Sequence, residues 1–193
     1  MIITNILLDI IAKILKITQN EQIPIMFMGG LAISVWAEPR ATYDIDGVID
    51  IERSNLENFL KELTKEGFIY DKSNPIKLIQ NLPFITLIYP IEEQEIYIDL
   101  FLAKSRYSKE ALVRKQNVKI GNLTIPVIAP EDTILYKLLA GRTRDIEDIH
   151  QILIIQRGKL DLKYMMKWAE KLGIKTFLND EVKSAEDTED TDY

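Results

Sequence analysis

Three aspartates, each set in an apolar run, are the residues of this chain best suited to chemistry. Asp44 and Asp46 flank Ile45, and Asp99 lies between Ile98 and Leu100. A carboxylate in a buried strand costs free energy unless a positive group meets it. Side chains at i and i+2 of a strand point to the same face, roughly 6.5–7 Å apart. The pattern therefore predicts a divalent-metal site formed by Asp44, Asp46 and Asp99.

Such a site predicts phosphoryl transfer, provided that a neighbouring strand brings Asp99 beside the other two carboxylates. Three carboxylates can hold two Mg²⁺ ions about 3.5–4 Å apart, which suits an in-line displacement. Mg²⁺ prefers one or two carboxylates plus substrate phosphates over a complete protein cage. We therefore expect Mg²⁺ as the cofactor, with Mn²⁺ as the alternative ion.

Residues that suit a phosphate group precede the paired aspartates. Gly29 and Gly30 close an apolar run and lead directly into a helix. Free backbone N–H groups at the start of a helix bind anions, and glycine lets a phosphate approach the backbone closely. Arg40 and Thr42 stand just before Asp44, where they either contact phosphate or fix the loop. These four residues are the predicted nucleotide-binding residues of the first part of the chain.

The elements that must position these residues alternate between helix and strand patterns. Apolar spacing predicts helices at 2–18, 31–37 and from Ser54 to Gly67, the last opened by a capping box at Ser54–Glu57. Short apolar runs predict strands at 25–28, 42–51, 68–70, 76–79, 84–89 and 95–102. The turn residues Glu92–Gln94 join the last two strands into an antiparallel hairpin, and a second hairpin is expected at 117–120 and 123–128. Helices are expected at 130–140, 144–156 and 161–172. The basic residues 104–116 form a short helix or a loop.

This order predicts a mixed α/β (α+β) fold: a mixed β-sheet core with flanking helices, and a C-terminal helical lobe. We expect the core at residues 1–128, the helical lobe at 129–179 and a disordered acidic tail at 180–193. The tail holds seven acids and one base, so it carries the whole net charge of −6, and residues 1–179 are neutral. The acidity of the chain therefore does not argue against a nucleic-acid substrate.

Composition narrows the class of protein. The chain has 193 residues, 47% of them hydrophobic, and no cysteine, so disulfides and thiolate chemistry are excluded. No stretch approaches the ~20 uncharged residues of a membrane span. The apolar N-terminus lacks a basic segment and includes Asp9, Lys13 and Lys16, which is unlike a signal peptide. We expect a cytoplasmic protein that does not contact a membrane.

Taken together, these motifs resemble the nucleotidyltransferase superfamily of the DNA polymerase β type. The resemblance covers roughly residues 22–155 and depends on Gly29-Gly30, Asp44-Ile45-Asp46 and Asp99. Two further segments, Arg40–Asp44 and Leu138–Ile149, resemble the branch that includes the AbiEii-like toxins of toxin–antitoxin systems.

The resemblance implies transfer of a nucleoside monophosphate from an NTP to an acceptor hydroxyl. It implies that Asp44 and Asp46 bind both metals, that Asp99 binds the catalytic metal, and that Lys137 contacts the triphosphate. It also implies RNA, such as tRNA, as the acceptor, and a cognate antitoxin as a partner. The alternatives are a small-molecule (antibiotic) acceptor, a protein hydroxyl, or a degenerate module that binds nucleotide or a partner without transfer. Gly47 and the short length of the chain motivate the binding module, because the family usually has a large apolar residue at position 47.

Overall fold

The computed structural model describes residues 5–39 and 41–187, which form two compact units. The first unit comprises residues 1–31 and 40–128, and the second comprises 32–39 and 129–193. Each unit has its own packing and is described separately. Helix α2 (Gly29–Trp36) begins in the first unit and ends in the second.

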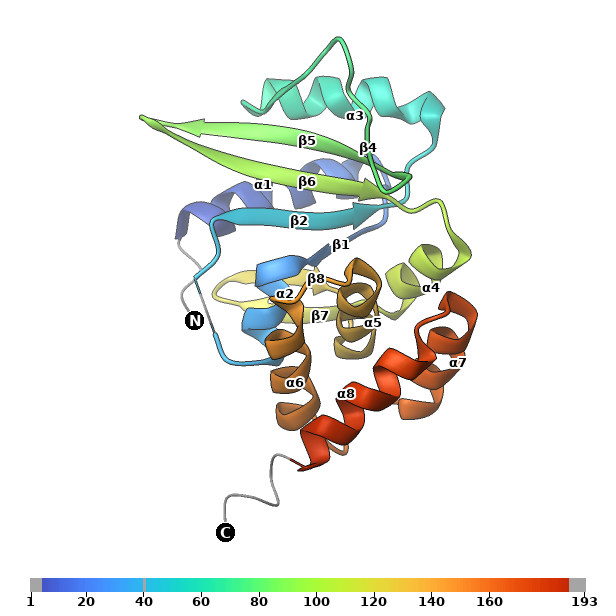
Figure 1. The fold of residues 1–193 in the computed structure, drawn as a ribbon. Coiled ribbons are helices and arrows are strands. Elements are labelled where there is room, and N and C mark those ends of the chain that lie inside the picture. The colour runs from blue at the N-terminus through green and yellow to red at the C-terminus, as the bar shows by residue number, and fades with distance from the viewer. Residues whose placement is uncertain (1–4, 40, 188–193) are drawn as a thin grey trace. The chain divides into compact units, whose positions relative to one another are not determined.

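The first unit is built on a mixed sheet, which has eight strands among the described residues. Its strand order is β3-β5-β6-β2-β1-β8-β7, with β4 also paired to β5 (Figure 1). Strand β2 runs parallel to β6 and antiparallel to β1, while β5 and β6 form an antiparallel hairpin. The strands are β1 (Ile25–Met28), β2 (Asp44–Ile49), β3 (Ile69–Tyr70), β4 (Lys77–Ile79), β5 (Leu82–Ile91), β6 (Gln94–Leu102), β7 (Gln116–Ile120) and β8 (Leu123–Val127).

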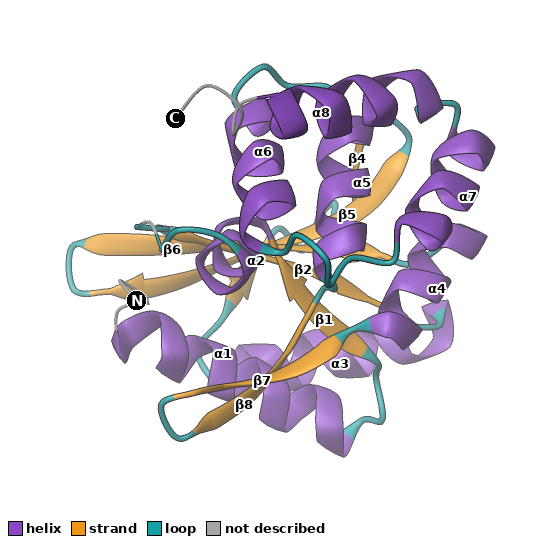
Figure 2. Ribbon diagram, turned by 90° about the horizontal axis from the view of Figure 1, so that it is seen from below, coloured by secondary structure: helices purple, strands orange, loops and turns teal. Residues whose placement is uncertain are grey.

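Helices α1 (Asn5–Asn20) and α3 (Arg53–Lys65) lie together on one side of this sheet, as Figure 2 shows. Each helix buries one apolar stripe, because its hydrophobic residues recur at helical spacing. Lys13 of α1 forms a 3.1 Å ion pair with Glu66, the residue that follows α3. Burial of these stripes against the sheet forms the core of the first unit.

Strands β2, β6 and β5 have one buried face and one more open face. Ile45 and Ile49 of β2, Ile98 of β6, and Ile85 and Leu87 of β5 are at most 3% exposed. Except for the buried Val48, the intervening residues of these strands are more exposed, as the two-residue period of a strand requires. The three predicted carboxylates, Asp44, Asp46 and Asp99, belong to this more exposed set, so the buried face fixes the side on which they emerge.

The second unit is helical in its described part. It contains α5 (Pro130–Ala140), α6 (Asp145–Ile155), α7 (Leu162–Leu172) and α8 (Lys175–Asp187), all labelled in Figure 1. Pro130 occupies the first turn of α5, and the Asp161 side chain caps α7 by accepting the Tyr164 N–H at 2.9 Å. The Gln156 amide donates to the Trp36 carbonyl at 2.8 Å, which links residues 32–39 to this unit.

The predicted fold class is confirmed, with two local corrections. Helix α3 starts at Arg53 after Glu52 and has no side-chain cap, so the predicted capping box at Ser54–Glu57 does not form. Helix α8 extends to Asp187, so residues 180–187 are helical where disorder was expected. Leu178 and Ala185 are buried, and Glu181 bonds His150 of α6 at 2.6 Å, so the acidic segment is packed despite its charge. Residues 188–193 lie outside the described part.

Among the described residues, no helix is both long enough and apolar enough to cross a bilayer.

Candidate active site

The register of β2 and β6 brings the three predicted carboxylates to one face of the sheet. Asp46 lies directly opposite Asp99 in the parallel pairing, and Asp44 lies opposite Tyr97. Paired residues on neighbouring strands share a face and are about 4.8 Å apart. Asp44 is exposed, whereas Asp46 and Asp99 are half-buried. The strand pairing therefore clusters Asp44, Asp46 and Asp99, although 53 residues separate Asp46 from Asp99 in the sequence.

Threonine hydroxyls orient two of these carboxylates. The Thr42 hydroxyl lies 3.0 Å from Oδ1 of Asp44, and the Thr86 hydroxyl lies 2.8 Å from Oδ1 of Asp99. Each hydroxyl donates to one carboxylate oxygen and leaves the other oxygen available to a ligand. Thr42 was predicted as a phosphate contact or a loop residue, and it contacts the first carboxylate. Thr86 was not predicted.

Gly29 and Gly30 leave room for the side chains of Asp46 and Thr42. Gly29 has φ +64°, and a Cβ atom on it would lie 2.0 Å from Oδ2 of Asp46. A Cβ atom on Gly30 would lie 2.4 Å from the Thr42 hydroxyl. Any side chain at either position would therefore displace a group of the site. This close approach places the start of α2 beside Asp46, where its backbone N–H groups suit a phosphate.

Gly47 has a packing explanation that is separate from the chemistry. It follows Asp46 and points to the buried face, where a Cβ atom would lie 3.1 Å from Cδ2 of Leu100 and 3.2 Å from the Met26 carbonyl. Leu100 thus fills the volume that a larger residue at position 47 would take. The glycine is accommodated by its neighbours and leaves the backbone of Asp44–Ile49 a regular strand.

The donor set of this cluster fits a hard divalent cation. Three carboxylates and nearby threonine hydroxyls are the oxygen ligands that Mg²⁺ and Mn²⁺ accept. In the part of the chain that the structure describes, no group of three or more His, Cys, Asp or Glu side chains is already arranged to hold a metal ion. A partly open carboxylate set is what Mg²⁺ uses when substrate phosphates complete its coordination.

An exposed tyrosine lies next to the carboxylates. Tyr97 is 49% exposed and pairs in register with Asp44 on one side and Ile88 on the other. Its hydroxyl donates to Oε2 of Glu95 at 2.9 Å, and this hydrogen bond raises the pKa of Tyr97. Because the hairpin turn at Glu92–Glu93 fixes the β5–β6 register, counting back from that turn would have placed Thr86 and Ile88 beside the site.

Lys137, the remaining predicted nucleotide-binding residue, belongs to a buried ion-pair network in the second unit. Its Nζ atom lies 2.8 Å from Oδ1 of Asp145 and 2.6 Å from Oδ2 of Asp148, and Arg142 Nε lies 2.6 Å from Oδ2 of Asp145. Lys137, Asp145 and Asp148 are each at most 8% exposed. Burial alone raises the pKa of Asp145, but the hydrogen bonds from Lys137 and Arg142 outweigh it and hold the pKa below its ordinary value. The predicted role of Lys137 at the triphosphate stays a prediction.

Arg40, also predicted to bind nucleotide, lies outside the described residues. The structure describes the other predicted residues of the first unit. Gly29 and Gly30 begin α2, Thr42 lies two residues before β2, Asp44 and Asp46 lie on β2, and Asp99 lies on β6.

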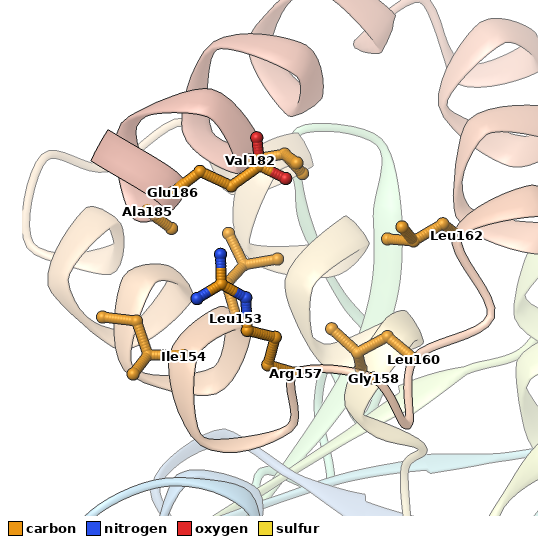
Figure 3. A pocket seen from close by; sticks show the side chains of 9 residues that line it. All are labelled: Leu153, Ile154, Arg157, Gly158, Leu160, Leu162, Val182, Ala185 and Glu186. Carbon is orange, nitrogen blue, oxygen red and sulfur yellow. The ribbon is translucent and has the colours of Figure 1, made fainter. Parts of the chain in front are cut away.

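A separate pocket lies within the second unit, between α6 and α8 (Figure 3). It encloses about 100 Å³ and is lined mainly by aliphatic side chains, with Arg157 and Glu186 as its charged members. Ligand sites for drug-sized molecules are roughly 300–1,000 Å³. This pocket is therefore too small to hold a nucleoside triphosphate.

Comparison with known proteins agrees with this geometry. The model of the family described as "Nucleotidyltransferase of unknown function" (DUF6036) matches residues 5–187. No curated protein is similar in sequence to this chain.

Solved structures with the same fold are distant in sequence. A Thermotoga maritima protein assigned to the nucleotidyltransferases is 16% identical, with a TM-score of 0.51, over 76% of this chain and 91% of that one. The antibiotic-resistance factor ANT(2″)-Ia is 13% identical in its solution structure, with a TM-score of 0.53, over 94% and 95% of the two chains. In its complex with adenylyl-2″-tobramycin it is 15% identical, with a TM-score of 0.52, over 85% and 95%. At such identities these similarities establish the fold alone.

Proposed function

Since the chain belongs to the nucleotidyltransferase family DUF6036, we propose that it transfers a nucleoside monophosphate from an NTP to an acceptor hydroxyl at the Asp44–Asp46–Asp99 cluster. One observation carries this proposal: Asp46 and Asp99 are register neighbours on parallel strands, with Asp44 on the same face. Gly29 and Gly30 lie against Asp46 and Thr42, so the phosphate-binding backbone and the carboxylates adjoin.

The proposed reaction is an in-line displacement at the α-phosphorus. The acceptor hydroxyl oxygen forms a bond to this phosphorus, and the bond from phosphorus to the α–β bridging oxygen breaks. Pyrophosphate leaves with that electron pair, and the hydroxyl proton passes to solvent. Bound Mg²⁺ or Mn²⁺ would lower the pKa of the hydroxyl and stabilise charge on the phosphates.

The residues of the chain have distinct roles in this proposal. Asp44, Asp46 and Asp99 hold the metal ions, and the backbone N–H groups of Gly29 and Gly30 bind phosphate oxygens. Thr42 and Thr86 keep two of the carboxylates in fixed orientations, as hydrogen-bond partners of metal ligands commonly do. Arg40 and Lys137 are the two further candidates for contact with the triphosphate.

The acceptor is the least constrained part of the function. An RNA acceptor, a toxin role and an antitoxin partner in the cytoplasm depend on resemblance to the AbiEii-like branch alone. A small-molecule acceptor has support from the β5–β6 hairpin, because residues 82–102 contain no lysine, arginine or histidine. The binding-only alternative was motivated by Gly47, whose small size is explained by Leu100 packing.

A labelled-transfer assay tests the proposed function. The wild-type chain and Asp46→Asn are incubated with each α-³²P-labelled NTP, Mg²⁺ or Mn²⁺, and total tRNA or a small-metabolite extract, with EDTA as the metal-free control. We expect label on an acceptor, pyrophosphate release, and loss of both in the variant and in EDTA. Transfer that persists in Asp46→Asn would remove the metal assignment, and NTP binding without pyrophosphate release would favour the binding module.

A further inference from the structure

The pocket of the second unit has a buried aliphatic floor and an open edge. Leu153 of α6 and Ala185 of α8 are at most 7% exposed, whereas Ile154 and Leu162 are 36% and 48% exposed. The other aliphatic residues of the lining are Leu160 and Val182. A hydrocarbon group that enters this pocket removes its own apolar surface and that of the lining from water. The lining therefore favours an aliphatic ligand.

The size of the pocket limits how large this aliphatic group can be. A dry apolar cavity of about 150 Å³ holds benzene, which has six carbon atoms. In proportion, the volume of about 100 Å³ between α6 and α8 suits a group of about four carbon atoms. The isobutyl side chain of leucine is a group of this size.

Two opposite charges adjoin the aliphatic lining. Figure 3 shows the Arg157 guanidinium and the Glu186 carboxylate on the same side of the pocket, with Leu160 and Leu162 on the other side. Both charged residues are exposed, so a ligand reaches them from solvent. A guanidinium binds a carboxylate, and a carboxylate binds an ammonium group, through charge-assisted hydrogen bonds. An α-amino acid carries both of these groups on the carbon atom that bears its side chain.

The charges around the pocket favour a ligand without net charge. The charged residues next in sequence to the lining residues are three of each sign: Lys159, Lys163 and Lys183, and Asp161, Glu181 and Asp187. With Arg157 and Glu186, the local charge is therefore balanced. A simple anion or cation gains little long-range attraction from such surroundings, whereas a zwitterion meets one partner of each sign.

We propose that this pocket binds free L-leucine, with the leucine carboxylate on Arg157, the ammonium group on Glu186 and the isobutyl group in the aliphatic lining. The site goes beyond the proposed transferase function, because none of its lining residues is a predicted metal or nucleotide residue. Binding of leucine needs neither NTP nor a metal ion, so this proposal and the proposed function succeed or fail separately.

A titration of the full chain with L-leucine, without NTP or metal, tests the proposal. Methyl NMR shifts are followed at Ile154, Leu160 and Val182. The comparison ligands are L-alanine, isocaproate, which is leucine without the ammonium group, and isoamylamine, which is leucine without the carboxylate. We expect leucine to bind in the millimolar range and about 10–60-fold more tightly than alanine, since each buried methylene is worth about 4-fold. It should exceed each singly charged ligand by about 2–10-fold.

Charge variants separate the two ends of the ligand. Arg157→Gln should weaken leucine and isocaproate by about 2–10-fold and leave isoamylamine unchanged. Glu186→Gln should weaken leucine and isoamylamine by a similar factor and leave isocaproate unchanged. Both substitutions are at exposed positions, so the fold should persist. Lys159→Gln, next to the pocket but outside its lining, is the matched control and should keep the wild-type affinity for all three ligands.

Unfolding gives a second readout of the same binding. Both tryptophans belong to the second unit, and a ligand that binds only the folded state stabilises it, so leucine should raise the urea midpoint of tryptophan fluorescence. The absence of methyl shifts at leucine concentrations far above the millimolar range would overturn the proposal. Equal affinity for leucine and alanine, or unchanged leucine affinity in either charge variant, would also overturn it.

Discussion

Two groups of aspartates show how the surroundings of a carboxylate set its role. In the first unit, Asp44 and Asp99 each accept a hydrogen bond from a neutral threonine hydroxyl. Among the described residues, neither forms an ion pair with a lysine or arginine. In the second unit, Asp145 and Asp148 are buried and receive Lys137 and Arg142 at 2.6–2.8 Å.

The two groups differ in whether their carboxylate charges remain available to a metal ion. A hydroxyl orients a carboxylate without neutralising it, so the charge can still attract a metal ion. Lys137 and Arg142 balance the charges of Asp145 and Asp148 within the network. Buried charges persist when they are paired in this way. A contact between Lys137 and a triphosphate would therefore compete with two short ion pairs.

The largest expected effect is on transfer when a carboxylate of the first group is neutralised. Asp46→Asn removes one metal ligand and its charge, so the rate of nucleotidyl transfer should fall by more than about 10³-fold, since metal stabilisation supplies several kcal/mol. The melting temperature should stay the same or rise, because like charges are then separated. Asp50→Asn is the control, since Asp50 is four residues further along and pairs with Lys109. A comparable loss of activity in Asp50→Asn would show that the effect is not specific to the cluster.

Replacement of Lys137, the lysine of the second group, should instead lower the stability of the second unit. Lys137→Met leaves Asp145 and Asp148 buried without their cation, so the free energy of unfolding should fall by about 3–5 kcal/mol. Both tryptophans, Trp36 and Trp168, belong to the second unit, so tryptophan fluorescence in urea reports on it. Lys163→Met, at an exposed position of α7, is the control. If Lys137→Met keeps wild-type stability and loses NTP binding, Lys137 is a nucleotide ligand and the contrast between the two groups fails.

A threonine variant tests whether the hydroxyls matter to the first group. Thr86→Val removes the 2.8 Å hydrogen bond to Asp99 and preserves the shape of the side chain. Partners of metal ligands are typically worth 10–100-fold in metal affinity or activity, so Mn²⁺ binding should weaken by about that factor. Electron paramagnetic resonance measures Mn²⁺ affinity without turnover, and Thr86→Ser should restore it. Wild-type Mn²⁺ affinity in Thr86→Val would show that Asp99 needs no such support.

Local patterns in the sequence predicted most of the elements and the shared face of Asp44 and Asp46. The i, i+2 spacing fixes that face wherever the strand is, because the pleat alternates with every residue. The hairpin turn at Glu92–Glu93 is also local, and it determines that Thr86 lies opposite Asp99. These features depend on neighbours in the chain, so the sequence contains enough information to place them.

Non-local pairing and burial could not be predicted in this way. The parallel register that sets Asp46 opposite Asp99 joins strands 53 residues apart, and nothing in either strand specifies it. Lys137 resembled a solvated or nucleotide-binding lysine because its partners follow a turn, eight and eleven residues later. Residues 180–187 looked disordered by charge, whereas burial of Leu178 and Ala185 and the His150–Glu181 contact keep them helical.

The smallest expected effect is the pH dependence of stability that Asp145 introduces. Its pKa in the folded state lies below the ordinary value of about 3.9, because Lys137 and Arg142 stabilise the ionised form. Its contribution to the free energy of unfolding is therefore complete above about pH 4 and is lost as the pH falls through the lower, folded-state pKa. Urea unfolding followed by tryptophan fluorescence from pH 6 to pH 3 should show this decline in wild type and a shallower one in Asp145→Asn. Glu170→Gln, at an exposed position of α7, should retain the wild-type slope. An equal slope in Asp145→Asn would mean that the ion pairs of the second group do not favour the ionised carboxylate, and the contrast with the threonine-held aspartates would then lose its electrostatic basis.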